Sequence, residues 1–225
     1  MAGVLSTGKA PRGGKRPNAG RKKSDDFKYD PSHAKRPDLF FKHPVHVMLR
    51  VLSSVPRLRQ RDGYEAIREA LLYFVDGASF RVVHISIQRN HLHLVVEAAH
   101  KEALARGMQR FAIRAARALN AAFEREGKVF AFRYKAKQIK TAHYARNVIA
   151  YVLNNWRKHH EDRRYEGMPF DRFTSAEAFA GWTTGDPGKP PDFGLPVSPP
   201  RTELLVFDWQ LFGLIDPFEV PGQVM

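Results

Sequence analysis

The chain has 225 residues and a formal net charge of +14 at pH 7, which suits one domain of ordinary size with extensions. Its 37 Lys and Arg against 23 Asp and Glu point to a polyanionic partner, either nucleic acid or an anionic membrane face. The apolar runs are far shorter than the roughly 20 residues of a membrane-spanning helix, and no cysteine is present for a disulfide or a thiolate site. Without an apolar signal segment near its start, the sequence predicts a soluble, cytoplasmic protein without membrane contact.

The positive charge is concentrated before residue 160. Residues 1–23 hold seven basic residues, no acid and frequent Gly and Pro, so this segment cannot bury enough surface to fold alone. We assign residues 1–42 to a basic, mostly disordered arm, which serves either as a solubilising tail or as a contact to DNA phosphates. The candidate DNA contacts in this arm are Arg12, Lys15, Arg16, Arg21 and Lys22.

The C-terminal part has the opposite character. In residues 161–225 acids outnumber bases eleven to five and proline is frequent. Large apolar side chains such as Trp182 and Trp209 nevertheless need a surface to cover. We therefore expect residues 161–225 to form an acidic, Pro-rich wrap around the domain, with a short helix.

Between residues 43 and 160 the hydrophobic pattern switches between a period of two and a period of 3.6. The predicted elements, in chain order, are strand 45–51, a helix between Pro56 and Asp76, strands 80–88 and 91–97, helix 101–126, strand 129–137 and helix 141–160. This order predicts an α+β fold of the ferredoxin-like split βαβ type, with an antiparallel β-α-β-β-α-β sheet and helices on one face. An extra C-terminal helix and an extended tail follow it.

His91 and His93 occupy alternate positions of the third predicted strand. They point to the same face of the sheet, close enough to share a cation, and Leu92 and Leu94 take the core-facing side. A histidine pair on a strand is often only polar filler, but the continuous apolar face opposite leaves both imidazoles on an open sheet face. A metallohydrolase of the His-x-His-x-Asp-His type is excluded, because Val95 stands where its aspartate is needed.

Two further patterns lie near the last predicted helix. Tyr151 and Asn155 are one turn apart on it, although a tyrosine in an apolar helix stripe is often an ordinary core residue. Arg133, Lys135 and Lys137 alternate along the preceding strand in a segment without acids, which favours contact with phosphates. A second basic stripe, on helix 101–126, has the ordinary explanation of a solvated helix face.

Three segments resemble one family. VHISIQRNHLHLVVE at residues 83–97 is similar to the His-hydrophobic-His strand of the HUH-type single-tyrosine transposases, and so are FAFRYK at 130–135 and NVIAYVLNN at 147–155. The similarity is greatest to the insertion-sequence and REP-associated tyrosine transposases, and it covers residues 43–160.

The resemblance implies that residues 43–160 are a catalytic domain that cleaves single-stranded or hairpin DNA and rejoins it through a 5′-phosphotyrosine. It implies Tyr151 as the nucleophile, on the last helix. His91, His93 and Asn155 would hold a divalent metal, Mg²⁺ or Mn²⁺. The implied partner is DNA, bound by a monomer or a homodimer, with Arg133, Lys135 and Lys137 as contacts.

Three alternatives stay open on the residues alone. An RNA-recognition motif has the same element order, and the run Gly127-Lys128-Val129-Phe130 is similar to its aromatic signature, but that signature belongs on the strand that here carries His91 and His93. A domesticated DNA-binding protein would keep the fold without strand transfer. A rolling-circle initiator or relaxase shares the chemistry but normally has further domains.

Overall fold

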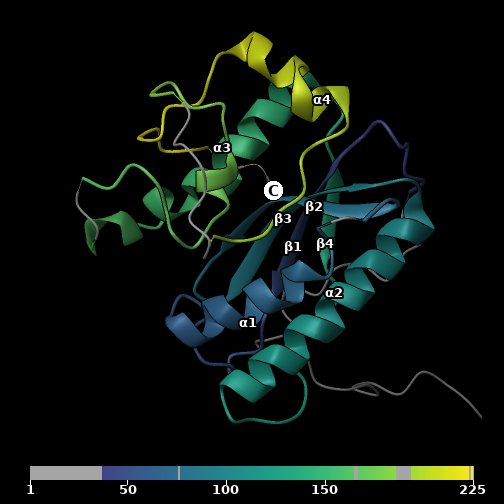
Figure 1. Cartoon of the computed structure of the whole chain (residues 1–225), viewed down its shortest axis with the longest axis vertical. Coiled ribbons are helices and arrows are strands. Elements are labelled where there is room, and N and C mark those ends of the chain that lie inside the picture. The colour runs from purple at the N-terminus through teal and green to yellow at the C-terminus, as the bar shows by residue number, and fades with distance from the viewer. Residues whose placement is uncertain (1–36, 76, 165–166, 186–193, 223, 225) are drawn as a thin grey trace, which may run out of the picture.

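The computed structural model describes residues 37–75, 77–164, 167–185, 194–222 and 224. The five DNA contacts expected in the basic arm, at Arg12, Lys15, Arg16, Arg21 and Lys22, lie outside these ranges. At the centre of Figure 1 is a four-stranded antiparallel sheet in the order β2-β3-β1-β4. Its strands are β1 (Val45–Arg50), β2 (Phe80–Ile87), β3 (His91–Ala98) and β4 (Lys135–Gln138). This order confirms the predicted ferredoxin-like arrangement.

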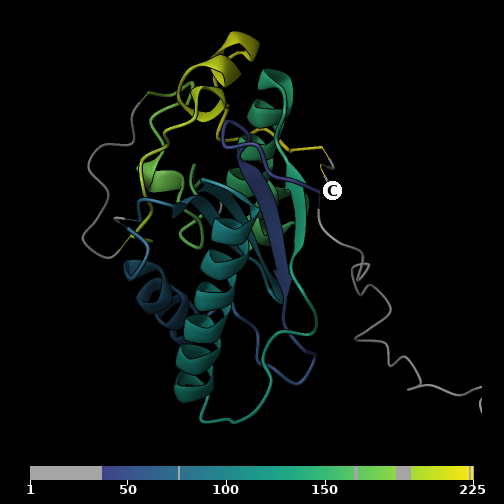
Figure 2. The same ribbon diagram turned by 90° about the vertical axis from the view of Figure 1, so that its right-hand side faces the viewer.

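Two helices cover one face of the sheet, as the prediction required. They are α1 (Arg61–Leu72) and α2 (Lys101–Ala122), and α2 lies in front of the strands in Figure 2. Alternate strand residues such as Val47, Leu94 and Ile85 are completely buried beneath them. The helix predicted to reach residue 126 ends at Ala122.

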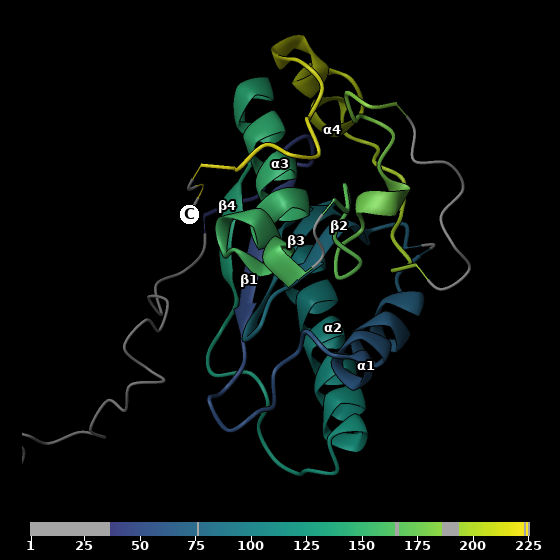
Figure 3. The ribbon, with the colours of Figure 1, turned by 90° about the vertical axis from the view of Figure 1, so that its left-hand side faces the viewer.

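The other face is covered as well, by α3 (Ala142–Lys158), which lies in front of the strands in Figure 3. Thr141 begins this helix, because its side-chain oxygen accepts a hydrogen bond from the Tyr144 N–H. A second apolar core lies on this side and joins α3 to residues beyond 170, among them Trp182, Trp209 and Ile215. The C-terminal elements are η2 (Glu161–Arg164), η3 (Ala176–Ala178), α4 (Glu203–Val206) and η4 (Asp208–Phe212).

Polar contacts fix the C-terminal segment to the outer side of α3. Arg146 makes two hydrogen bonds of 2.7 Å to the Glu219 carboxylate. The Asn154 amide donates to the Asp216 carbonyl at 2.9 Å, and Arg157 donates to the Pro217 carbonyl at 2.6 Å. The helix is therefore enclosed by the sheet on one side and by the acidic segment on the other.

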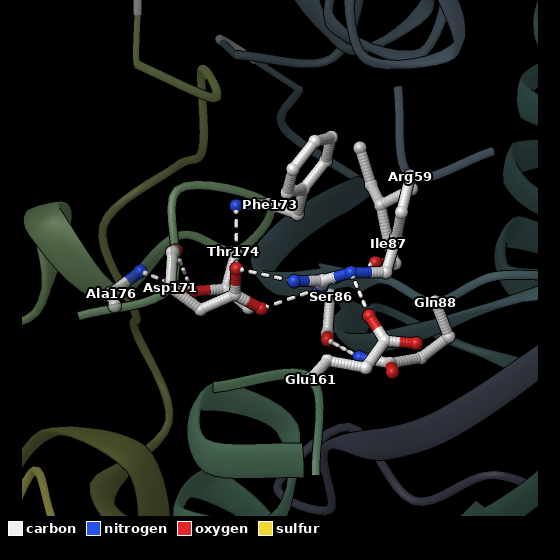
Figure 4. A network of polar contacts seen from close by, with 9 residues as sticks. All are labelled: Arg59, Ser86, Ile87, Gln88, Glu161, Asp171, Phe173, Thr174 and Ala176. Atoms are coloured by element: carbon white, nitrogen blue, oxygen red, sulfur yellow. Dashed lines mark hydrogen bonds and ion pairs between the residues drawn. The ribbon is translucent and has the colours of Figure 1, made fainter. Parts of the chain in front are cut away.

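A buried ion-pair network ties the segment after α3 to the start of α1 (Figure 4). The Arg59 guanidinium forms a two-bond pair with Asp171, contacts Glu161 and donates to the Ile87 carbonyl at 3.1 Å. On the neighbouring strand end, Gln88 donates to the Ser86 hydroxyl at 2.6 Å. The network anchors Glu161 and residues 171–176 beside the end of β2.

The strand predicted at 129–137 is shorter than expected. Phe130 forms only an isolated bridge with Val51, and regular pairing begins where Lys135 meets Met48. Residues 131–134 therefore stand opposite only two residues of β1, and the surplus loops out of the sheet. Arg133 lies in this irregular segment, so its predicted position on the strand with Lys135 and Lys137 is wrong.

A β-bulge also interrupts β2. The pairing register with β3 shifts between Val82 and His84, so Val83 is an extra residue. This shift lets Val82 and Ile85 both face α1 and α2, although they are three residues apart. His84 and Ser86 face α3 instead.

Candidate active site

The two predicted histidines lie between the sheet and α3. His93 is only 1% exposed and His91 is half-buried. The expectation of an open sheet face is therefore wrong for His93, because α3 and the segment after it cover this side. The predicted separation of faces is confirmed, since Leu92 and Leu94 are fully buried in the core on the other side.

Three imidazoles form a continuous chain of close nitrogen contacts. His91 Nε2 lies 3.0 Å from His93 Nε2, and His93 Nδ1 lies 3.1 Å from Nε2 of His46 on β1. The other nitrogen of His91, Nδ1, lies 2.8 Å from the Asn90 side-chain oxygen. The chain of contacts crosses from the β2–β3 turn to the middle of the sheet.

These imidazoles are neutral at physiological pH. Burial lowers the pKa of His91 to about 4, with smaller contributions from His159 and Arg50. Burial also lowers the pKa of His46 to about 3 and the pKa of His93 well below its ordinary value. Each ring therefore keeps a nitrogen lone pair, which is the form that binds metal ions.

Tyr151 packs directly against this histidine chain from α3. Its ring stands edge-on to the His93 ring at a centroid distance of 5.1 Å, and the His46 ring is 5.9 Å away. The side chain is 8% exposed, and burial raises the pKa of its hydroxyl. The Lys158 ammonium, two turns along the helix, lies 5.3 Å from the centre of the Tyr151 ring. The tyrosine is thus a protonated phenol beside a cation.

Asn155 lies one helical turn beyond Tyr151, on the same face of α3. The next turn carries His159, whose ring is 6.4 Å from the His91 ring, so Asn155 faces the histidines between these two contacts. Asn155 is fully buried, yet neither its oxygen nor its nitrogen has a hydrogen-bond partner within the described ranges. An unpaired buried amide is costly, so the Asn155 oxygen is available to a ligand.

The residues fit a divalent ion. His91 Nε2 and His93 Nε2 are 3.0 Å apart. This separation is expected for two ligands that bind one ion at about 2.1 Å each, with an angle of about 90° between the two bonds. No group of three His, Cys, Asp or Glu that could hold a metal occurs in the part of the chain that the structure describes. The third protein ligand would therefore be the unpaired Asn155 oxygen, and the remaining positions would be open to a phosphate.

The basic residues predicted to contact DNA are separated. Lys135 and Lys137 pair with Met48 and His46, so they share the histidine side of the sheet at its β4 edge. Lys137 donates to the Val224 carbonyl at 3.2 Å and lies over the Tyr144 ring. Arg133 is exposed outside the strand and lines a groove of about 430 Å³ with Phe130 and Phe132.

The sequence prediction missed three residues of the site, His46, Lys158 and His159, and a buried neighbour of it, Gln88. His46 had a detectable signal, because it alternates with Val45 and Val47 and so lies on the polar face of β1. Gln88 is buried at the end of β2 and pairs with the His91 carbonyl through its own N–H. Lys158 and His159 follow Tyr151 at helical spacing, but polar residues near a helix end are too common to indicate a site.

The chain is similar to known proteins in sequence and in fold. Residues 40–155 match the family model of the IS200-like transposases. A solved structure of a REP-associated tyrosine transposase bound to a REP hairpin is similar to this chain. The similarity covers 64% of this chain and 83% of the transposase chain, with a TM-score of 0.49 and 15% sequence identity. No match was found among curated proteins. None of the helices in the described ranges is long and apolar enough to cross a membrane.

Proposed function

We propose that this chain, which belongs to the IS200-like transposase family, cleaves and rejoins single-stranded DNA by a metal-dependent reaction through Tyr151. The family gives the chain a role in transposition and the class of a DNA-processing enzyme. The tyrosine chemistry, the metal and the residue roles are the proposal. It places the catalytic domain at residues 43–160, between the basic arm and the acidic C-terminal segment.

The observation that carries the proposal is the contact between Tyr151 and His93. The proposed nucleophile and the two imidazole nitrogens proposed to bind metal come from distant segments and meet in one buried site, next to an unpaired amide. Tyr151 belongs to the apolar core beside α3, and its ring also packs against two imidazoles. Histidines with lowered pKa values around a buried phenol are typical of a catalytic site.

In the proposed site, His91 and His93 would hold a divalent ion, Mg²⁺ or Mn²⁺, with the Asn155 oxygen as third ligand. When bound, the ion supplies positive charge to a non-bridging phosphate oxygen, which otherwise repels a nucleophile. The chain itself orients the Tyr151 oxygen and excludes water by burying its ring. Lys158 lies where it can stabilise negative charge on the phenol as its proton leaves.

The reaction is a transesterification. The Tyr151 oxygen forms a bond to phosphorus, the bond from phosphorus to the 3′ oxygen breaks, and the proton lost by the phenol is matched by one gained at the released 3′-hydroxyl. The product is a 5′-phosphotyrosine and a free 3′ end. Because the phosphodiester energy is retained in the tyrosine linkage, the 3′-hydroxyl of another strand can reverse the step without a nucleotide cofactor.

The DNA partner is proposed to be single-stranded or hairpin DNA, bound by a monomer or a homodimer. Lys135 and Lys137 are placed to hold phosphates, since they lie on the histidine side at the open edge of the sheet. Arg133 lines a groove with α2 residues such as Met108, so it is proposed to contact the DNA away from the histidine side. The basic arm, including Arg12, Lys15, Arg16, Arg21 and Lys22, would add contacts that do not depend on base sequence.

The test is incubation of the purified chain with end-labelled single-stranded DNA from the termini of its own locus, with Mn²⁺ or with EDTA. The expected result is a protein–DNA adduct that survives denaturation, forms only with the metal and leaves a free 3′-hydroxyl. DNA binding without an adduct would support the domesticated DNA-binding alternative. Equal adduct formation in EDTA would contradict the role of the histidines.

A further inference from the structure

We propose that His46 is a positioning residue, which fixes the orientation and the protonated nitrogen of His93 so that His93 Nε2 can bind metal. The inference rests on the proposed function, because it assumes that His93 is a ligand. The observation that supports the inference is the 3.1 Å contact between His46 Nε2 and His93 Nδ1. Both side chains are buried.

The sheet fixes this contact. His46 pairs with Val95, and His93 pairs with Met48, so the two histidines are diagonal neighbours on adjacent antiparallel strands and share one face. Their ring centroids are 5.1 Å apart, at an interplanar angle of 34°. Two strands of the central sheet fix the backbone positions of both residues, and the burial of both rings restricts how far either can turn.

His46 cannot itself be a third ligand of the same ion. The two nitrogens of an imidazole point to different sides of the ring, and His46 contacts Nδ1 of His93 while His91 contacts Nε2. An ion held by the two Nε2 atoms therefore lies on the side of His93 that faces away from His46. Metal-binding histidines commonly use their second nitrogen to donate to a neighbouring acceptor, which sets the ring orientation.

The positions of the protons on the three histidines follow from their hydrogen bonds. Without metal, His91 donates its Nδ1–H to the Asn90 oxygen, so His91 Nε2 carries a lone pair. This lone pair accepts a hydrogen bond from the Nε2–H of His93. His93 Nδ1 then accepts a hydrogen bond from the Nε2–H of His46. Metal binding needs the His93 Nε2 lone pair, so the His93 proton must occupy Nδ1 and be donated to His46 Nε2. The His46 proton then occupies Nδ1, and each ring still carries one proton.

His46 suits this exchange because its Nδ1 has no hydrogen-bond partner among the described residues. The ring can therefore present either a donor or an acceptor at Nε2 without breaking another contact. Within the described ranges His46 Nδ1 has no partner in either form, so the exchange does not change the number of unpaired groups. What changes is the strength of the hydrogen bond, because coordination makes the His93 Nδ1–H a stronger donor. A residue at position 46 that cannot accept from this donor would therefore weaken metal binding.

The first measurement is Mn²⁺ affinity of the full chain without DNA, by titration with detection of free Mn²⁺ by electron paramagnetic resonance. His46→Phe keeps an aromatic ring against Tyr151 but cannot accept a hydrogen bond, and we expect it to weaken affinity about 10- to 100-fold. His46→Gln keeps an acceptor and should recover most of the loss. The matched control is His84→Phe, because His84 is buried on the same face and packs against Phe179 instead of the histidine chain.

The second measurement is the ¹⁵N spectrum of the imidazoles in the wild-type chain, which reports which nitrogen carries the proton. Addition of Mg²⁺ should move the His93 proton from Nε2 to Nδ1. The inference would be overturned if His46→Phe bound Mn²⁺ with wild-type affinity or if the Phe and Gln variants lost equal affinity. It would also be overturned if the proton of His93 stayed on Nε2 after Mg²⁺ was added. His91→Ala tests the metal site separately: if it binds Mn²⁺ as wild type does, the proposed metal site is wrong and the inference is overturned with it.

Discussion

The rings of Tyr151 and His93 meet edge to face, with their centroids 5.1 Å apart, although one lies on α3 and the other on β3. The C-terminal segment enforces the contact from behind, since Arg146 and Asn154 bind Glu219 and Asp216 on the outer side of the helix. The proposed nucleophile and the proposed ligand are thus brought together within one chain.

Tyr151→Phe should abolish the covalent adduct and leave DNA affinity nearly unchanged, because only the attacking oxygen is removed and the ring packing is kept. Tyr144→Phe is the matched control. The Tyr144 hydroxyl lies on the same helix but donates to the Val224 carbonyl at 2.9 Å. Denaturing gels with labelled DNA measure the adduct. An adduct that persists in Tyr151→Phe and disappears in Tyr144→Phe would move the nucleophile to Tyr144.

His91→Ala and His93→Ala should both lose Mn²⁺ binding and cleavage, but their effects on stability should differ. His91 is half-buried, so its removal should change the free energy of unfolding by less than about 1 kcal/mol. His93 is 1% exposed, so its removal leaves a cavity and should cost about 2 kcal/mol. Urea unfolding and Mn²⁺ titration check the two quantities. If His93→Ala is destabilised and still binds Mn²⁺ normally, His93 is only a core residue.

Deletion of residues 1–23 should weaken DNA binding and flatten its salt dependence, because each phosphate contact contributes roughly 0.7 to 0.9 to the slope of log affinity against log salt. Cleavage at saturating DNA should stay near normal. Replacement of Lys135 and Lys137 by Ala should lower the saturated rate itself, since both lie on the histidine side of β4 and would place the strand to be cut. Single-turnover assays at several salt concentrations measure both effects, and an equal loss of rate in the two variants would contradict this division.

Stability should fall in mild acid through His84. Burial lowers the pKa of His84 to about 4 from 6.5, so between these values the unfolded chain binds a proton that the native chain does not. Unfolding therefore becomes easier as pH falls below 6.5, and His84 alone should account for about 2 kcal/mol at pH 4.5. Urea unfolding of wild type and His84→Gln at pH 7 and 4.5, in EDTA, checks this: the variant should have the smaller pH dependence. Equal pH dependence would mean that His84 is solvated in the native chain.

Asp171→Ala should destabilise the chain by about 3 kcal/mol, because it removes the two-bond partner of Arg59, whose side chain is only 7% exposed. Glu65→Ala is the matched control. It breaks the pair between Arg61 and Glu65, which is exposed on α1, and should cost less than about 0.5 kcal/mol. Thermal or urea unfolding distinguishes them, and similar small losses would show that Glu161 alone suffices for Arg59.

The sequence was informative where one periodicity decides the structure. Alternation in residues 91–96 places His91 and His93 opposite Leu92 and Leu94, and the structure confirms it. The predicted fold also implies that the first strand lies beside the third, so His46 could have been assigned to the histidine face. Alternation alone does not show how two rings on neighbouring strands are oriented, and it gave no reason to expect a nitrogen contact of 3.1 Å.

Other features depend on tertiary packing that no local pattern contains. Burial of His93 follows from α3 and the C-terminal segment, which pack on the face expected to be open. The surplus residues at 131–134 have the same alternation as a strand, yet the bridge at Phe130 and the pairing at Lys135 leave them only two partners on β1. The network of Arg59 joins residues more than a hundred positions apart, beyond the reach of any motif.

The bulge at Val83 gives neighbouring strands different tolerance to a change in length. Val83 and His84 together stand opposite Val95. Loss of Val83 would therefore remove the bulge and give β2 a regular alternation of faces, with Phe80 and Ile85 still facing α1 and α2. Loss of Leu92 from β3 would instead turn one imidazole into the apolar core. Related chains can therefore be aligned with a one-residue gap in β2, whereas a gap inside β3 would mark a different protein interior.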